Sequence, residues 1–264
     1  MKKAMETDRL STESIRGAID TKLIGRNILY YPTTASTMDV AKQAAKDGAA
    51  EGTVIIADRQ TAGRGRLKRE WLAPTGSSLL LSILLYPEPE ILRRLTMVAC
   101  LAVSRGIEQV TGLKADIKWP NDVLINNRKV SGILSEADIS GDSIRYAIVG
   151  IAINVNLDTN AIPEIAGTAT SLSMELGRKV SRLKVLVALL NEFDSLYAAL
   201  QRGEPICQQW RQRLETIGRR VTVRCGDEVQ QGYAEDVDEN GNLLLRHDDG
   251  SLSTIAAGDV TLRE

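Results

Sequence analysis

A glycine- and arginine-rich segment is the first part of the sequence whose residue types suggest chemistry. It reads Gln60-Thr-Ala-Gly-Arg-Gly-Arg66 and continues through Arg69 to Trp71. The glycines let the backbone approach a ligand closely. The arginines offer planar donors that suit phosphate or carboxylate, and Trp71 offers a flat ring on which a base could stack. A solvated basic turn or a nucleic-acid contact would explain Gly-Arg-Gly-Arg equally well by itself.

A second segment, Lys118-Trp-Pro-Asn-Asp122, contains a proline directly after a tryptophan. Pro120 disfavours a helical conformation at Trp119, so the pattern predicts a strand that ends in a rigid turn. Lys118 and Asp122 would then project beside one another at the end of that strand. As an isolated pentapeptide, the segment is explained more simply as a structural turn with an exposed lysine.

Two further segments carry polar residues within apolar surroundings. Arg128-Lys-Val-Ser-Gly-Ile133 predicts the return strand of a hairpin with Lys129 near its start, where a lysine is usually solvated. Gly150-Ile-Ala-Ile-Asn-Val-Asn156 places two asparagines in an otherwise apolar strand. A buried asparagine must form hydrogen bonds, and structural pairing meets that need as well as a ligand does.

Alternating strands and helices are expected to position these segments in the first half of the chain. Ser36 or Thr37 can cap a helix that Gly48 ends, and Pro89 suits the first turn of another. The polar, glycine-containing stretch 58–71 must be a loop. The predicted strands are residues 26–31, 53–57 and 78–86, and the predicted helices are residues 8–20, 34–48 and 89–110.

The second half is expected to continue with strands and helices and then to change character at Gly218. The earlier part contains strand, turn and strand over 117–137, with the turn at 126–128, then a long strand over 143–156 and helices at 170–176, 182–201 and 205–217. Later short strands are predicted at 221–224, 229–237, 243–246 and 252–256, with turn signals at Gly226, Gly241 and Gly250. This spacing predicts a β-barrel of about 45 residues.

Length and composition exclude several classes of protein. The 264 residues are 43% hydrophobic, enough for one sizeable core and a small second domain. The net charge is −1 with 25% charged residues, which gives no general attraction to nucleic acid or membrane. No apolar run approaches the ~20 residues of a membrane span, and the N-terminus lacks the apolar stretch of a signal peptide. These features predict a cytoplasmic protein.

Cysteine and histidine usage narrows the chemistry further. Cys100, Cys207 and Cys225 lie far apart, which argues against a disulfide scaffold and a structural zinc site. His247 is the only histidine, so a metal site with several histidines is impossible. An enzyme with this composition is expected to act by positioning and electrostatics.

The motifs, taken together and in this order, resemble the biotin–protein ligases. The resemblance runs from about Ile24 to the C-terminus. It implies an α+β fold in which a mixed β-sheet is flanked by helices, related to the catalytic fold of class II aminoacyl-tRNA synthetases. The implied domains are a short helical extension (1–25), a catalytic domain that binds biotin and ATP (26–217) and a small C-terminal β-barrel (218–264). The motifs are Ser36-Thr37, Gly63-Arg-Gly-Arg66 with Trp71, Lys118-Trp-Pro-Asn-Asp122, Lys129 with Ser131-Gly-Ile-Leu134, and Gly150-Ile-Ala-Ile-Asn154.

The activity that this resemblance implies is ATP-dependent biotin–protein ligation. Biotin and ATP would form biotinyl-5′-adenylate with release of pyrophosphate, and biotin would then pass to a lysine of a biotin carboxyl carrier protein. Mg²⁺ is the expected cofactor, and the carrier of acetyl-CoA carboxylase is the expected acceptor. A homodimer formed through the sheet edge is a further expectation from the family.

Matching the motifs assigns roles to individual residues. The implied catalytic residues are Arg66, Lys118 and Lys129. The implied biotin-binding residues are Ser36, Thr37, Met38, Gln60, Gly63, Arg64, Gly65, Arg66, Lys129 and Gly132. The implied ATP-binding residues are Arg64, Arg66, Arg69, Trp71, Lys118, Asn121, Asp122, Lys129 and Asn154, with Asp122 also a ligand of Mg²⁺. Lys68 stands where the family loop often has a third glycine, so this loop is expected to close differently.

Some family members also carry an N-terminal helix-turn-helix domain and repress transcription. Only about 25 residues precede the catalytic region here, too few for a three-helix module, and Glu6, Asp8 and Glu13 interrupt its basic residues. No DNA binding is therefore expected.

Two rival functions remain open at this point. One is a ligase for lipoate or octanoate on a related fold, and the other is a non-enzymatic sensor of biotin or nucleotide. Arg66, Lys118 and Lys129 argue against a pure sensor, which would not need all three, and turnover of ATP would separate the classes.

Overall fold

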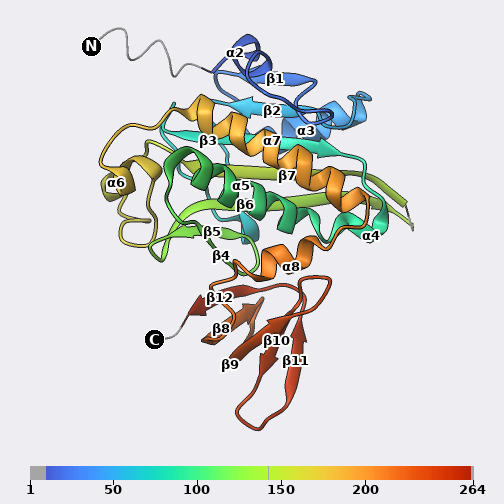
Figure 1. The fold of residues 1–264 in the computed structure, drawn as a ribbon, viewed down its shortest axis with the longest axis vertical. Helices are drawn as coiled ribbons and strands as arrows, with labels where there is room; N and C mark the ends of the chain where they lie inside the picture. The colour runs from blue at the N-terminus through green and yellow to red at the C-terminus, as the bar shows by residue number, and fades with distance from the viewer. Residues whose placement is uncertain (1–9, 142, 263–264) are drawn as a thin grey trace.

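The computed structural model describes residues 10–141 and 143–262. A seven-stranded mixed sheet forms its larger part, in the order β1-β2-β3-β7-β6-β5-β4 (Figure 1). β1 and β2 are parallel, and all other neighbouring strands are antiparallel. The strands are β1 (Ile28–Tyr31), β2 (Val54–Ala57), β3 (Ser78–Leu85), β4 (Asp116–Lys118), β5 (Asp122–Ile125), β6 (Arg128–Ser140) and β7 (Ser143–Asn154).

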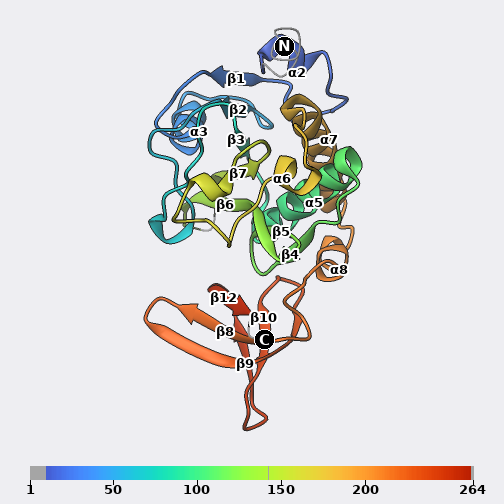
Figure 2. The same cartoon turned by 90° about the vertical axis from the view of Figure 1, so that its left-hand side faces the viewer.

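Helices cover both faces of this sheet, which explains why two of its strands are buried along their whole length. Every residue of β2 and β3 is buried. Helix α3 (Thr37–Lys46) packs on one face, against β2, β3 and β7. Helices α5 (Leu95–Thr111) and α7 (Arg182–Gln201) pack against each other and cover the opposite face (Figure 2). The predicted mixed sheet flanked by helices is confirmed.

Several helices differ in extent from their predictions. The stretch 89–110 forms two helices, α4 (Pro89–Leu92) and α5, and the last one ends at Gly112 with a left-handed φ of 73°. Within 8–20, α2 covers Thr12–Arg16, and residues 8 and 9 lie outside the described residues. α6 is Leu172–Leu176, and short 3₁₀ turns occur at Arg66–Lys68 and Thr159–Ala161.

Helix α8 is shorter than predicted because part of its expected sequence hydrogen-bonds to β4 instead. It covers Ile206–Arg211 rather than 205–217. The Ile117 amide donates to the Arg213 carbonyl at 2.8 Å, and the Glu215 amide donates to the Ile117 carbonyl at 2.8 Å. These bonds form a single parallel bridge at Leu214, and the residues on either side of Leu214 lie in turns.

The C-terminal part forms a second, antiparallel sheet in the order β11-β10-β9-β8-β12. The strands of the predicted small barrel are present, but among the described residues β11 and β12 lie at opposite edges of an open sheet, so the barrel is not closed by hydrogen bonds. The last strand was not predicted. The strands are β8 (Arg220–Cys225), β9 (Glu228–Val237), β10 (Leu243–Arg246), β11 (Leu252–Ile255) and β12 (Asp259–Leu262).

Two tryptophans lie where this second sheet meets the first. The Trp119 indole Nε1 donates to the Gly241 carbonyl at 2.9 Å, and the Trp119 amide donates to Thr216 Oγ1 at 2.9 Å. Gly241 has a φ of 78°, and a Cβ there would lie 2.4 Å from Met97 Cε and 3.5 Å from the Trp210 ring. The close approach therefore requires glycine at this turn.

No helix in the described part of the chain is both long enough and apolar enough to cross a lipid bilayer.

Candidate active site

A cavity of about 250 Å³ lies beneath the glycine-rich loop, against α3, β6 and β7. Most of the residues that the sequence motifs singled out line it. These are Ser36, Thr37, Met38, Gln60, Arg64, Gly65, Arg66, Arg69, Trp71, Asn121, Asp122, Lys129, Gly132 and Asn154. The structure thus brings together segments that are far apart in the sequence.

Two of the predicted site residues do not line the cavity. Gly63 lies inside the loop, where a Cβ would be 3.0 Å from Gln60 Nε2 and 3.3 Å from the Trp71 carbonyl. Lys118 ends β4 opposite Asp122, and it is partly exposed. The roles assigned to both residues stay predictions.

The glycine-rich loop folds back on itself above the cavity. Arg64 and Glu70 form an antiparallel bridge, and the Trp71 amide donates to the Gly63 carbonyl at 3.0 Å. The chain reverses near Leu67, an exposed residue with a φ of 54°, a left-handed conformation that favours glycine. Whether Lys68 makes the loop close differently from its family pattern stays a prediction.

Arg64 connects this loop to α3 and β6. Its guanidinium donates two hydrogen bonds to the Asp39 carboxylate, at 2.7 and 3.0 Å, and lies 3.8 Å from Glu136. The hydrogen bonds from Arg64 hold the pKa of Asp39 below its ordinary value. The same contact raises the pKa of Arg64. Paired in this way, Arg64 fixes one side of the loop.

Replacing Asp39 with asparagine is expected to loosen that side of the loop, because the neutral amide cannot form the bidentate ion pair. Limited digestion with trypsin at pH 8, followed by mass spectrometry, should show several times faster cleavage after Arg64. The lowered pKa means that the pair is complete above the ordinary pKa of an aspartate and is lost only as the pH falls through the lowered value. Wild-type protection should therefore be the same at pH 6 as at pH 8.

Asp47→Asn, an exposed change at the end of the same helix, is the matched control and should leave cleavage after Arg64 unchanged. Equal rates of cleavage after Arg64 in Asp39→Asn and the wild type would show that the Arg64–Asp39 ion pair does not hold the loop in place.

The other two loop arginines contact the C-terminal sheet. Arg66 Nη1 donates to Asn121 Oδ1 at 3.0 Å and to the Gly258 carbonyl at 3.1 Å, and lies 3.7 Å from the Asp259 carboxylate. Arg69 pairs with Asp259 at 2.5 Å. Asp259 also lines the cavity. The second sheet therefore supplies one wall of the site.

Lys129 is the cation at the centre of the site. Its Nζ lies 2.6 Å from Asp122 Oδ1 and 5.6 Å from the centroid of the Trp71 ring. A Cβ at Gly132 would lie 3.0 Å from the Trp71 ring and 3.1 Å from Lys129 Nζ. Glycine at position 132 thus leaves room for the lysine and the indole to meet beside the cavity.

Polar groups from α3 and the loop gather at another part of the cavity. Gln60 Oε1 accepts from the Thr37 amide at 2.7 Å and from Thr37 Oγ1 at 3.0 Å. Buried Ser82 Oγ donates to Thr37 Oγ1 at 2.8 Å. Ser36 begins α3 but its side chain does not cap the helix, which leaves the hydroxyl for another partner.

The two asparagines of the apolar strand segment have different hydrogen-bond partners. The Asn156 amide exchanges hydrogen bonds with the Val180 carbonyl (2.9 Å) and amide (3.0 Å), so it is structural. Asn154 is 2% exposed, and its Nδ2 donates to the Thr170 carbonyl at 3.1 Å. Asn154 Oδ1 is buried and has no hydrogen-bond partner among the described residues. The side chain therefore has one acceptor to offer to a ligand.

Further lining residues were given no role from the sequence. Five of them, Ile133, Leu134 and residues 150–152, lie within the quoted motifs, whereas Ile165, Ala169 and Asp259 carry no local signal. These residues are Glu70, Leu72, Leu81, Ile133, Leu134, Gly150, Ile151, Ala152, Ile165, Ala169 and Asp259.

Known proteins resemble the chain over nearly its whole length. The model of the biotin/lipoate A/B protein ligase family matches residues 30–154, and that of the biotin protein ligase C-terminal domain matches residues 216–263. The bifunctional ligase/repressor BirA of Bacillus subtilis (strain 168) is 37% identical over 259 residues, which cover 96% of this chain and 79% of that protein. The biotin–[acetyl-CoA-carboxylase] ligase of Mycobacterium tuberculosis is 31% identical and matches 97% of this chain and 98% of its own.

A solved structure supports the same relationship. Biotin protein ligase from Aquifex aeolicus, in complex with biotin and ATP, superimposes with a TM-score of 0.78 at 32% identity, and the match covers 90% of this chain and 99% of that one. Family models match both parts of the chain, and the architecture agrees with that of the Aquifex aeolicus protein. The chain belongs to the biotin protein ligase family.

Proposed function

We propose that the protein is an ATP-dependent biotin–protein ligase, which forms biotinyl-5′-adenylate and transfers biotin to a lysine of a biotin carboxyl carrier protein. What supports this activity most is one cavity lined by four cationic side chains, Arg66 and Lys129 among them, together with an aromatic ring and a separate polar cluster. The Aquifex aeolicus relative, 32% identical, was solved with biotin and ATP.

The two substrates are proposed to occupy opposite ends of the cavity. Ser82 pairs with Gly150 between β3 and β7, and Ser78 pairs with Asn154. The Thr37–Gln60 cluster beside Ser82 therefore lies about 13 Å along the strand from Asn154. The polar cluster is suited to the ureido group of biotin, and Asn154 to the nucleotide.

Lys129 and Arg66 would stabilise the adenylation step. A biotin carboxylate oxygen attacks the α-phosphorus, and the bond from that phosphorus to the pyrophosphate oxygen breaks. No proton moves, so the reaction needs alignment and positive charge near the phosphate oxygens. Trp71 would stack against the adenine, while its contact with Lys129 holds the ammonium beside the α-phosphate.

A magnesium ion would fit Asp122, one of three acidic side chains that line the cavity. Mg²⁺ usually keeps several waters and takes one or two protein carboxylates together with substrate phosphates. Asp122 is the predicted ligand, and it lines the cavity next to Asn121. No group of three or more acidic, histidine or cysteine side chains within residues 10–141 and 143–262 forms a closed metal cage. The ion would supply positive charge to the leaving pyrophosphate.

Transfer of biotin follows on the same site. The neutral amine of the acceptor lysine attacks the acyl carbon of the mixed anhydride, the bond to the phosphate oxygen breaks, and AMP leaves while the amine loses a proton. Residues 133–140 of β6 extend beyond their pairing with β5, which leaves a strand edge suited to a homodimer.

Because ATP is supplied in the cytoplasm, we propose that the protein works there.

Biotin-dependent exchange of labelled pyrophosphate into ATP is the decisive measurement. The purified protein is incubated with ATP, Mg²⁺ and biotin, and with lipoate or octanoate in parallel. Exchange with biotin alone is expected. Exchange with lipoate or octanoate instead would keep the ligase class and overturn the substrate, and tight biotin binding without exchange would favour a sensor.

A further inference from the structure

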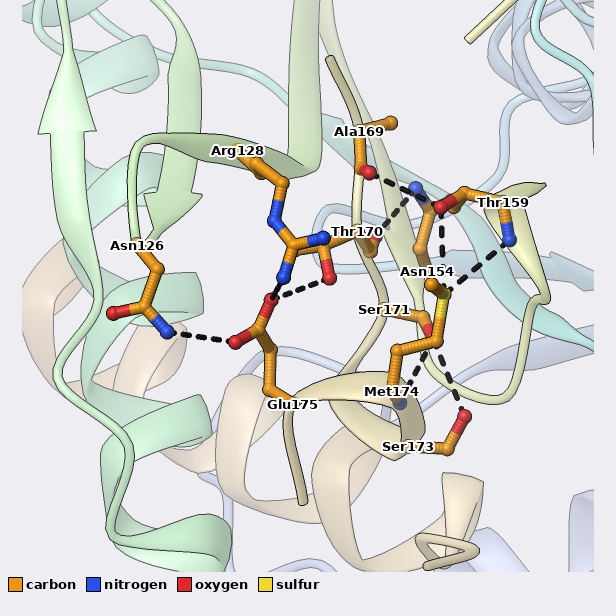
Figure 3. Close-up of polar contacts among 10 residues, drawn as sticks. All are labelled: Asn126, Arg128, Asn154, Thr159, Ala169, Thr170, Ser171, Ser173, Met174 and Glu175. Carbon is orange, nitrogen blue, oxygen red and sulfur yellow. Dashed lines mark hydrogen bonds and ion pairs between the residues drawn. The ribbon is translucent and has the colours of Figure 1, made fainter. Parts of the chain in front are cut away.

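A network of buried hydrogen bonds behind the cavity fixes the orientation of the Asn154 amide (Figure 3). Its partner, the Thr170 carbonyl, can only accept a hydrogen bond, so the amide nitrogen must face Thr170. The oxygen Oδ1 is then the free edge of a side chain that lines the cavity. A buried acceptor without a partner is unfavourable, and a ligand that donates a hydrogen bond removes that cost.

Thr170 is itself held on both sides. It is fully buried, and its amide donates to the Lys129 carbonyl at 2.8 Å. Its hydroxyl donates to Glu175 Oε1 at 2.5 Å. On the preceding residue, the Ala169 carbonyl accepts from Thr159 Oγ1 at 3.1 Å. The carbonyl that orients Asn154 therefore has little freedom to move.

Glu175 connects this segment to the turn before Lys129 (Figure 3). Its side chain is 5% exposed and accepts from Arg128 Nη2 at 2.6 Å and from Asn126 Nδ2 at 2.7 Å. One carboxylate thus joins α6, the β5–β6 turn and Thr170. A buried carboxylate with charged and neutral donors is rigidly held, because losing any of them leaves its charge less compensated.

We propose that Glu175 is a positioning residue for selection of the nucleobase. It holds Thr170, whose carbonyl turns the Asn154 amide so that Oδ1 faces the base as an acceptor. An acceptor at this point pairs with the 6-amino group of adenine and repels the 6-oxo group of hypoxanthine or guanine. This role rests on the proposed function only for the location of the nucleotide.

The test compares ATP with inosine triphosphate, which carries a 6-oxo group. The ratio of kcat/KM for the two nucleotides in biotin-dependent pyrophosphate exchange is expected to be about a hundred in the wild type. Glu175→Ala should lower that ratio about tenfold, because the amide can then rotate and present its nitrogen. The KM for biotin should not change. Purine riboside triphosphate, which lacks the 6-substituent, should gain relative to ATP in the same variant.

Thr170→Val provides a second variant if removal of Glu175 disturbs folding. It deletes the hydroxyl that Glu175 accepts from, while it keeps the backbone carbonyl and nearly the same volume. We expect a change in the same direction. Glu164→Gln, which removes an exposed charge from the same segment, is the matched control and should leave the ratio at its wild-type value.

The outcomes separate this role from general stability and from the proposed function. If Glu175→Ala and Thr170→Val lower exchange with both nucleotides equally, the ratio is unmoved, Glu175 is merely structural and the inference is overturned. If the wild type shows no exchange, the proposed function fails, and the same ratio is then read from the dissociation constants of the two nucleotides. A lowered binding ratio in the variants would still support the role of Glu175.

Discussion

Lys129→Met is expected to lower kcat/KM for biotin-dependent pyrophosphate exchange by about a thousandfold. Lys129 is the cation that contacts both Trp71 and Asp122 in the cavity, and we expect it to meet the α-phosphate. Methionine keeps the length of the side chain but removes the charge. It also leaves the Asp122 carboxylate without its ammonium partner, so that a negative group faces the phosphates.

Lys114→Met is the control for this experiment. Lys114 lies on the surface before β4, pairs with Asp116, and has a side chain that is 81% exposed. A surface ion pair of this kind contributes little, so exchange should stay within about twofold of the wild type. A loss of less than tenfold in Lys129→Met would contradict the central electrostatic role of Lys129.

Arg66→Gly is expected to release biotinyl-adenylate about a hundredfold faster than the wild type. The substitution removes the hydrogen bonds to Asn121 and Gly258 and the ion pair with Asp259. The loop would then close less tightly over the intermediate. Released adenylate reacts with lysines at random, so bystander proteins added to the mixture should become biotinylated. Mass spectrometry of an added unrelated protein measures this labelling.

Arg178→Gly, the same substitution at an exposed position between α6 and α7, should give no bystander labelling. If Arg66→Gly modified only the normal acceptor, retention of the intermediate would not depend on the contacts of Arg66.

Local patterns in the sequence were sufficient for much of the fold. The bounds of α7 and β10 agree with the predicted 182–201 and 243–246, because amphipathic periodicity and turn residues are local properties. α8 was predicted too long, since the pairing of 213–215 with the edge of the large sheet depends on residues about a hundred positions away. The same limit applies to the C-terminal sheet, because whether its edge strands meet is a tertiary property.

The residues of the candidate site could be predicted from the sequence to about the same extent as the fold. Motif residues such as Lys129 and Trp71 line the same cavity, but their contact with each other was not predicted. Nothing local marks Asp259, whose contacts with the loop depend on the docking of the second sheet. Nor does the pattern distinguish Asn154 from Asn156, which have the same residue type two positions apart and differ only in their partners. Glu175 likewise becomes informative only once its three donors are known.

The contact between Arg66 and Gly258 joins residues 192 positions apart, and this separation has a consequence during protein synthesis. The ribosome makes the glycine-rich loop long before it makes the strand that holds it. A nascent chain that already contains the sheet and α3 has the residues that we propose bind biotin, but its loop has no partner in the second sheet. Efficient retention of the adenylate must therefore wait until β12 has left the exit tunnel, and any adenylate formed earlier would escape as it is expected to do from Arg66→Gly.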